Sequence, residues 1–486
     1  MRIINKHNRW IDLLKDLLIS KLLVLVVLSF LLYIFYQTIL SNNILFAFGV
    51  VSLPFIFILL FLIIAYYEQG FYPVYISHFI LLSINSYIDI KLGVITALTT
   101  LSIFILIIVK GIYNSLDWKL SINSMLVFYA IWLIYCILEL ANPNAVFEAW
   151  NIAITQYAIY PLVCAILVPI SIKKKLHIYI LLYIWSVFVL YASFKGYWQK
   201  NHGFNDRELY FLFELGGAKT HLIWSGIRFF SIFSDATNFG IHMGMASIVF
   251  FISSMYAKKI HTKIYFLLIV CAATYGMFIS GTRASIAVPL IGLIYFTVVS
   301  KKINILISGS TFSILIVCFF MFTSIGESNQ YIRRMRTAFS PKEDASFQVR
   351  DRNREIMKTY MSNKPFGYGL GLGGKAERFK PKETIPVPPD SWLVSVWTDT
   401  GFVGLTLYIT VHLILFINST LILLFKIKDY ELKGLLIAWM SMAVAYFFIT
   451  YSSDVMQYPN SIIFFTSVAL CINASKLDKR ETKSSG

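Results

Sequence analysis

The sequence predicts an all-α, polytopic membrane protein with about 12–14 transmembrane helices and one large loop outside the bilayer. Of its 486 residues, 58% are hydrophobic and only 14% are charged, whereas soluble domains are usually about 25% charged. Apolar runs of about 20 residues recur along the chain, and each is long enough to cross a hydrocarbon core of roughly 30 Å. A transmembrane barrel would instead show short alternating segments.

The predicted spans follow these apolar runs in order along the chain. We expect them at 22–40, 44–66, 71–88, 92–110, 121–141, 151–172, 176–194, 236–257, 264–281, 284–300, 303–324, 402–425, 433–452 and 459–475. The third is the weakest, and it also fits a re-entrant or interfacial element that pairs with the second. The apolar run after the basic N-terminus lacks a small-residue cleavage site, which is typical of a retained signal anchor.

The distribution of Lys and Arg predicts the orientation, because short cytoplasmic loops carry the excess of these residues. With the N-terminus inside, the basic loops all fall on the cytoplasmic side, and so does the C-terminus. The predicted organisation is then a cytoplasmic N-terminus at 1–21, a bundle at 22–324 with a shorter external segment at 195–235, a large external loop at 325–401, further spans at 402–475 and a cytoplasmic tail at 476–486.

The formal net charge is +17, and most of it is explained by topology rather than by nucleic-acid binding. The loop at 325–401 is different, since it carries 13 Lys and Arg against 9 Asp and Glu and loops beyond about 60 residues are exempt from the topology rule. Its basic surface predicts an anionic partner, with a solvated loop as the alternative. The five cysteines are isolated in apolar runs and give no disulfide framework or metal spacing.

Two arginines lie at predicted external ends of helices. Arg283, in "SGTRAS", stands between two apolar runs, where a charged side chain is costly and usually faces a cavity or a partner. A guanidinium can bind phosphate oxygens through two parallel hydrogen bonds. The alternative is that Arg283 only extends to the interface.

Arg228 precedes the span at 236–257, in "RFFSIFSDATNFG". Ser234, Asp235 and Asn238 are residue types that favour a helix N-terminus, and the free N–H groups there suit an anion. The alternative is that Arg228 is an interfacial anchor and Asp235 only a helix cap.

The large loop contains a predicted amphipathic helix at 347–361, which "NKPFG" ends. Arg350 and Arg354 are four residues apart and therefore lie on one face of it. The run "GYGLGLGG" that follows is no phosphate-binding Walker loop, and a flexible turn is its default interpretation.

Four stretches between about 220 and 425 resemble, in their order, the motifs of the O-antigen ligase and polymerase superfamily of bacterial inner-membrane proteins. They are "RFFSIFSDATNFG", "SGTRASIAVPLIGLIYF", "RDRNREIMKTYMSNKPFGYGLGLG" and "PDSWLVSVWTDTGFVGLTLY". The resemblance implies that the large loop is periplasmic. It also implies an enzyme of lipopolysaccharide or other surface-polysaccharide biosynthesis that needs neither metal nor cofactor. Its donor would be a glycan on undecaprenyl pyrophosphate, and its acceptor lipid A–core or a growing glycan.

The resemblance also implies roles for individual residues. Asp390 falls where many ligases have the histidine proposed as catalytic, and Asp399 matches a family glutamate. We therefore expect Asp390 to orient or deprotonate the acceptor hydroxyl, with His221 on the other external segment as the alternative base. Asn238 and Asp399 are expected among the substrate-binding residues, with Arg228, Arg283, Arg350 and Arg354.

Ligase and polymerase remain equal alternatives, because Ser391 replaces the family asparagine and Lys364 interrupts its Asn-Pro pair. A polysaccharide transporter or flippase is a rival class, but such proteins often show internal repeats and ionisable residues near the midplane. A scaffold protein would not need paired external arginines. Here the charges gather at helix ends and in one long loop, which favours an external active site.

Overall fold

A computed structural model of the chain describes residues 29, 33, 67–87, 92–113, 116–223, 226–339, 345–373 and 378–485. The chain divides into two compact units, Met1–Tyr67 and Glu68–Gly486, and nearly all of the described residues belong to the second. The two predicted spans at 22–40 and 44–66 lie outside the described residues, apart from Ser29 and Tyr33.

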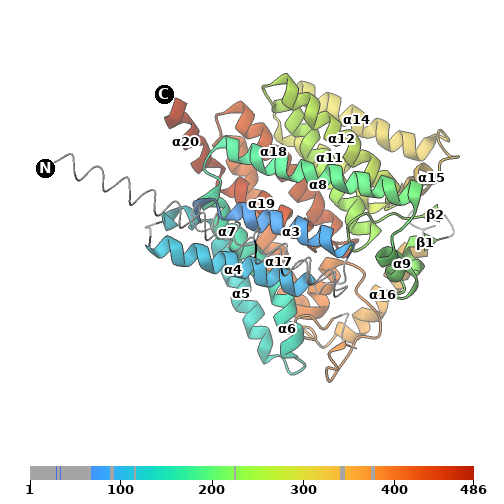
Figure 1. Cartoon of the computed structure of the whole chain (residues 1–486). Coiled ribbons are helices and arrows are strands. Elements are labelled where there is room, and N and C mark those ends of the chain that lie inside the picture. The colour runs from blue at the N-terminus through green and yellow to red at the C-terminus, as the bar shows by residue number, and fades with distance from the viewer. Residues whose placement is uncertain are drawn as a thin grey trace. The chain divides into compact units, whose positions relative to one another are not determined.

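The second unit is built almost entirely of helices (Figure 1), which confirms the predicted all-α class. The α-helices are α3 (Phe71–Asn85), α4 (Leu92–Tyr113), α5 (Ser124–Leu138), α6 (Phe147–Ile154), α7 (Tyr160–Ser171), α8 (Lys175–His202), α9 (Asp206–Phe213), α10 (Ala218–His221), α11 (Ala236–Tyr256), α12 (Ile260–Ile279), α13 (Ala284–Val299), α14 (Ile303–Phe322), α15 (Gln330–Arg336), α16 (Ala345–Met361), α17 (Trp392–Phe425), α18 (Tyr430–Ile449), α19 (Asn460–Ile472) and α20 (Ala474–Ser485). A π-helical turn, η4 (Thr155–Ile159), joins α6 to α7, and β1 (Leu222–Ile223) pairs with β2 (Gly226–Ile227).

Within the described part of the chain, eight helices are long and apolar enough to cross a membrane, and a ninth results if α19 and α20 form one bent span. Three shorter apolar helices, α3, α13 and most of α14, coincide with further predicted spans. The predicted amphipathic helix of the large loop is also present, as α16. The protein is therefore a multi-pass membrane protein, as its composition predicts.

The span predicted at 402–425 is part of a longer helix, since α17 begins at Trp392. Its first turns include Thr398, Asp399 and Thr400, which are buried and which lower the hydropathy on which the prediction rested. Gly401 has φ 68° and ψ −170°, so the helix bends there. A Cβ on Gly401 would lie 2.0 Å from the Pro365 carbonyl oxygen, which only glycine avoids.

Helices α11 and α18 form the centre of the unit and are buried over most of their length, whereas α4 and α5 expose much of theirs. Helices that are apolar on all sides are suited to such a central place. Gly434 allows α18 to lie close against α11, because a Cβ at this position would overlap the ring of Tyr256, the last residue of α11. The central helices thus give the loops at their ends a rigid support.

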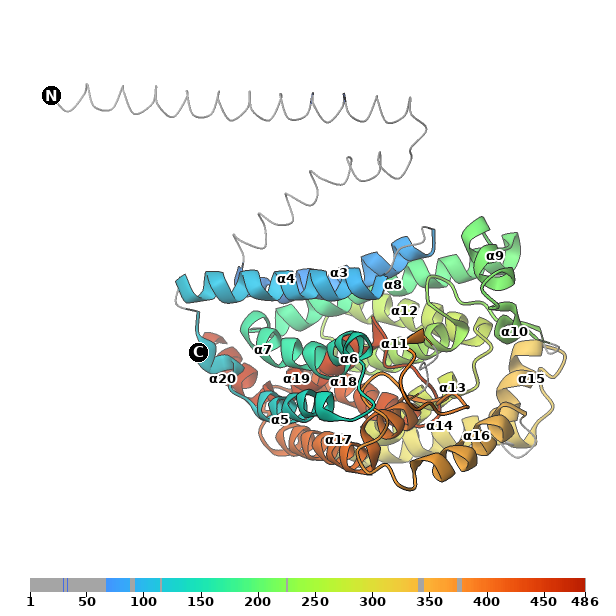
Figure 2. The same ribbon diagram turned by 90° about the horizontal axis from the view of Figure 1, so that it is seen from below.

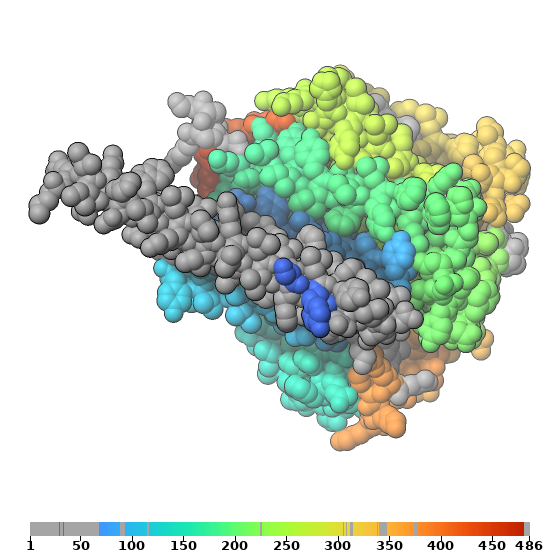
Figure 3. All heavy atoms as spheres, in the orientation of Figure 1, coloured from blue at the N-terminus to red at the C-terminus, as the bar shows by residue number. Residues whose placement is uncertain are grey.

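The loops fall into two groups at opposite ends of the helices, which we call the arginine end and the lysine end. The arginine end comprises the described residues 203–223, 226–235, 280–283, 323–339, 345–373, 378–391 and 450–459, and the lysine end comprises 172–174, 257–259, 300–302 and 426–429. Two views show α9 and α15 at one end and α20 at the other (Figures 1 and 2), and α10 lies near α9 in Figure 2. In the space-filling view, α8 and α9 (green) and α15 (gold) reach the same edge (Figure 3). Both predicted external segments therefore share the arginine end.

Candidate active site

Arginine side chains from separate segments gather around Gly281 at the arginine end. Gly281 has a φ of +57°, and a Cβ there would lie 3.3 Å from Arg334 Cδ and 3.5 Å from Arg228 Cγ. Arg283, two residues further on, donates from Nη1 to Thr337 Oγ1 over 3.4 Å. The turn between α12 and α13 thus joins the two arginines predicted from the sequence to α15.

The Arg228 guanidinium is held by neutral oxygen atoms. It donates to the Thr220 carbonyl oxygen at 3.1 Å, to Thr237 Oγ1 at 3.2 Å and to Thr282 Oγ1 at 2.9 Å. These partners come from α10, α11 and the turn before α13. Three hydrogen bonds fix the direction of the guanidinium without cancelling its charge.

Other arginines act on Arg228 through space. Burial lowers the pKa of Arg228 to about 10, Asp235 opposes this change, and the positive charges of Arg283 and Arg350 add to it. Arg228 still carries its charge at neutral pH. We call Arg228, Arg283, Arg334 and Arg350 the arginine cluster; its concentrated positive charge is suited to a phosphate or pyrophosphate group.

The N-terminus of α11 is closed by the chain itself, which differs from the expectation that its N–H groups face an anion. Asp235 Oδ1 accepts from the Thr237 and Asn238 amides at 2.8 and 2.9 Å, and His221 Nε2 accepts from the Ala236 amide at 3.1 Å. Asn238 is buried and donates from Nδ2 to Asp235 Oδ2 at 2.6 Å. Asp235 and Asn238 therefore hold the helix end beside Arg228.

His221 has both ring nitrogens engaged by the backbone. Because Nε2 accepts from the Ala236 amide, Nδ1 carries the proton and donates to the Gly217 carbonyl oxygen at 2.9 Å. Burial lowers the pKa of His221, the Gly217 hydrogen bond opposes this, and the nearby Arg228 charge lowers it further. A neutral, fully bonded imidazole has no lone pair available for a substrate proton, so this geometry counts against His221 as the alternative base.

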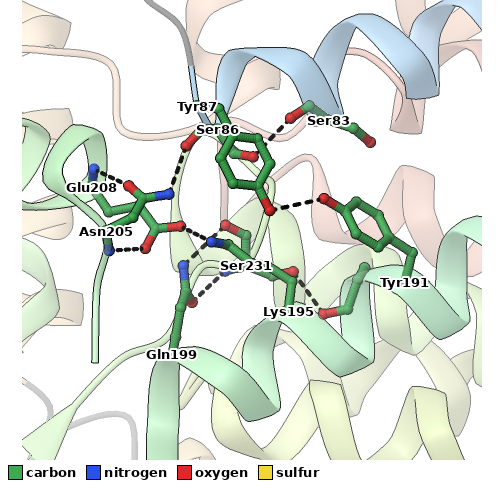
Figure 4. Close-up of polar contacts among 10 residues, drawn as sticks. Ser83, Ser86, Tyr87, Tyr191, Lys195, Gln199, Asn205, Glu208 and Ser231 are labelled. Atoms are coloured by element: carbon green, nitrogen blue, oxygen red, sulfur yellow. Dashed lines mark hydrogen bonds and ion pairs between the residues drawn. The ribbon is translucent and has the colours of Figure 1, made fainter. Parts of the chain in front are cut away.

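A buried polar network supports the segment that carries Arg228 (Figure 4). Lys195 of α8 pairs with Glu208 of α9 at 2.9 Å, with both side chains almost fully buried. Gln199 holds the Ser231 peptide on both sides, accepting from its amide at 2.8 Å and donating to its carbonyl oxygen at 3.1 Å. Ser231 has φ 54°, unusual for a residue other than glycine. Gln199 thus secures the strained turn between Arg228 and α11.

Asp390 is placed beside α16. Its Oδ2 accepts from Asn353 Nδ2 at 2.9 Å, and Asn353 lies on α16 between Arg350 and Arg354. Arg350 donates from Nη1 to the Ser452 carbonyl oxygen at 2.7 Å. The helix predicted from the sequence therefore brings Asp390 and two predicted arginines to the loop between α18 and α19.

Arg354 lies at the rim of this group. It donates to the Tyr451 carbonyl oxygen at 3.1 Å, and its guanidinium stands 4.5 Å from the centre of the Tyr451 ring. These contacts attach α16 to the loop at 450–459. The loop itself contains neither Lys nor Arg.

Asp399 holds the glycine-rich run against α17. Its Oδ2 accepts from the Gly371 amide and from Tyr157 Oη, both at 2.8 Å, and its Oδ1 accepts from the Gly373 amide at 2.6 Å. Positive φ at Gly369 and Gly371 allows the chain to turn around the carboxylate. The glycines thus permit close approach to Asp399 of the same chain, and Tyr157 fixes that carboxylate from the π-helical turn.

Arg334 is a cluster residue that the sequence did not single out. It belongs to "YIRRMR", where three arginines occur within four positions and nothing in the pattern selects one of them. Arg336 instead donates to the Phe319 and Phe320 carbonyl oxygens, at the end of α14. Residues two apart on a helix point in different directions, so only the fold decides which arginine reaches Gly281.

Comparison with known protein families gives a match. The family model described as O-antigen ligase matches residues 264–409, from α12 to the middle of α17. The matched segment contains Arg283, Arg334, Arg350, Asp390 and Asp399. The comparison with curated proteins gives no match.

Proposed function

We propose that this chain, which belongs to the O-antigen ligase and polymerase family through residues 264–409, transfers a glycan from undecaprenyl pyrophosphate to an acceptor sugar at its arginine end. The family indicates an O-antigen ligase-type enzyme with lipid-linked glycan substrates. We further propose that the arginine end faces the periplasm of a bacterial inner membrane and that both termini are cytoplasmic, because the lysine-rich loops share the opposite end.

The arginine cluster is the observation that carries this proposal. Arg228, Arg283 and Arg334 surround one turn, and Arg350 is close enough to lower the pKa of Arg228. In glycan transfer, negative charge develops on the departing pyrophosphate, and fixed guanidinium groups stabilise that charge. No nucleotide is needed, because the lipid-linked donor brings its own leaving group.

The proposed step is a direct displacement at the anomeric carbon. The acceptor hydroxyl oxygen forms a bond to that carbon, the bond from the carbon to the phosphate oxygen breaks, and its electron pair leaves with undecaprenyl pyrophosphate. The hydroxyl proton passes to the Asp390 carboxylate and then to water. This displacement inverts the anomeric centre. Asn353, which donates to Asp390 Oδ2 at 2.9 Å, keeps the carboxylate in place.

The acceptor separates the two family activities. Transfer to lipid A–core makes the protein a ligase, and transfer to another lipid-linked repeat makes it a polymerase. The matched family does not favour the alternative function of a transporter or flippase.

The test is a deletion strain whose lipid-linked glycans are extracted and sized. A lost polymerase leaves single repeats on undecaprenyl pyrophosphate, and a lost ligase leaves polymer there. Complementation by Arg283→Ala should fail, because Arg283 belongs to the cluster. Arg352→Ala should succeed, since Arg352 is exposed on the same helix as Arg350. An unchanged lipid-linked pool in the deletion strain would refute the proposed function.

A further inference from the structure

A cavity of about 720 Å³ opens at the arginine end, next to the arginine cluster but separate from it. Its walls are α4, the α6–η4 segment, the residues before and at the start of α17, and the loop at 454–458. None of the four cluster arginines is among the described residues that line it. The structure therefore contains a second, differently built space beside the proposed donor site.

One wall of the cavity is the apolar face of a candidate membrane span. Val94, Leu98 and Leu101 of α4 line it, at the spacing that places residues on one side of a helix. Val94 and Leu98 are more than half exposed, at 53% and 59%. The cavity is thus bordered by a surface on which an apolar chain can lie.

The other walls carry polar groups and aromatic rings. The π-helical turn contributes Gln156 and Tyr157, and the loop at 454–458 contributes Asp454, Gln457 and Tyr458. π-Helical turns within α-helices are frequent at functional sites. Carboxylate and amide groups accept hydrogen bonds from hydroxyl groups, and aromatic walls with a few placed polar groups are usual in ligand sites.

The cavity adjoins the proposed reaction centre at two points. Gln457 Oε1 accepts from Ser234 Oγ at 3.3 Å, next to the cap of α11. Pro389 and Trp392 line the cavity on either side of Asp390 in the chain. A group bound in the cavity therefore lies beside the segment that carries the proposed base.

We propose that this cavity is the acceptor site, occupied by the terminal sugar of an amphiphilic acceptor whose apolar chain runs along α4. The assignment rests on the proposed function, and it follows from the separation of charge. Among the described lining residues, Asp399 and Asp454 are the carboxylates and Arg378 is the cation, so a pyrophosphate is favoured in the arginine cluster and a neutral sugar here. Ligand pockets typically span about 300–1,000 Å³, so the cavity holds a terminal sugar unit rather than a polymer.

The experiment uses the full-length protein in nanodiscs with two probes. Undecaprenyl pyrophosphate reports the donor side. Transfer is measured from the lipid-linked glycans extracted from the deletion strain to varied concentrations of the acceptor, lipid A–core or a second lipid-linked repeat. Leu98→Trp fills the α4 wall and should raise the half-saturating acceptor concentration at least about tenfold, while the affinity for undecaprenyl pyrophosphate stays the same. Asp454→Asn, which preserves shape, should act in the same direction.

The matched control is Ile105→Trp, which adds the same ring to another exposed position of α4 outside the cavity lining, and which should behave as wild type. Weaker undecaprenyl pyrophosphate binding by Leu98→Trp would place the donor chain in the cavity and overturn the proposal. The proposal would also be overturned if Leu98→Trp and Asp454→Asn both left the half-saturating acceptor concentration unchanged. Failure of the proposed function can be told apart from failure of the acceptor-site proposal. If the proposed function is wrong, the wild-type protein will bind undecaprenyl pyrophosphate no more tightly than Arg228→Ala does.

Discussion

The two ends of the bundle use their cationic side chains differently. At the lysine end, Lys175 pairs with Asp429 at 3.0 Å and with Glu431 at 2.8 Å, and Tyr179 Oη donates to Glu431 Oε1 at 2.7 Å. At the arginine end, Arg228 binds two threonine hydroxyls and a carbonyl oxygen.

This difference separates a structural role from a functional one. A lysine paired with carboxylates is neutralised locally, and the group mainly fixes α8 to α18. A guanidinium held by hydroxyls and carbonyl oxygens keeps its direction and its positive potential, which is the condition for stabilising charge that develops during a reaction. The predictions below test whether the two ends are as distinct as their contacts indicate.

The largest effect is expected at Asp390. Asp390→Asn keeps the shape of the side chain but removes its ability to take a proton, so transfer should fall about 10²–10⁴-fold with unchanged thermal unfolding. The rate is measured with purified protein and extracted lipid-linked glycans. Asp351→Asn, an exposed aspartate on α16, should remain active. A near wild-type rate for Asp390→Asn would mean that the base lies elsewhere.

The arginine cluster should give the next largest effect. Arg228→Ala removes a fixed cation and should reduce transfer about 10²–10³-fold without preventing membrane insertion. Arg228→Lys should also be impaired, because an ammonium does not reproduce the fork of the guanidinium. Binding of undecaprenyl pyrophosphate and the transfer rate are measured together. Normal values of both in Arg228→Ala would make Arg228 an interfacial anchor.

At the lysine end, the expected effect is on stability alone. Lys175→Met leaves Asp429 and Glu431 without this partner and should destabilise the fold by about 1–3 kcal/mol, less than for a fully buried pair. Transfer per folded molecule should not change. Lys259→Met, at an exposed lysine of the same end, is the control. Loss of activity at unchanged thermal stability in Lys175→Met would abolish the distinction between the two ends.

His221 should show the smallest effect, as a pH dependence of stability. Its folded pKa is lowered below the unfolded value of about 6.5. The unfolded state therefore binds the proton first, and stability is lost as the pH falls below about 6.5. His221→Ala should be less stable at neutral pH and should lose this component of the pH dependence in thermal unfolding. If the slope persists in His221→Ala, other groups cause it.

The sequence by itself determined the class of the protein and the positions of its main elements. Runs of apolar residues predicted the spans because the cost of burying polar groups in lipid acts on each segment separately. The helix at α16 was predictable from its amphipathic pattern and from "NKPFG". Arg283 was recognisable because a charge between two apolar runs is costly, and Arg228 because it precedes a predicted span beside helix-capping residue types.

Only the tertiary structure decided how these residues act. The role of His221 depends on its hydrogen bond from the Ala236 amide, and the role of Asp399 depends on its hydrogen bonds from the Gly371 and Gly373 amides. The cavity exists because α4 and the loop at 454–458 border the same space. The only sequence signal of Asp454 is that it is a carboxylate in a loop without Lys or Arg. Such contacts join segments far apart in the chain. Which polar group meets which partner therefore depends on how the helices pack, while local periodicity reports only which face of each helix is apolar.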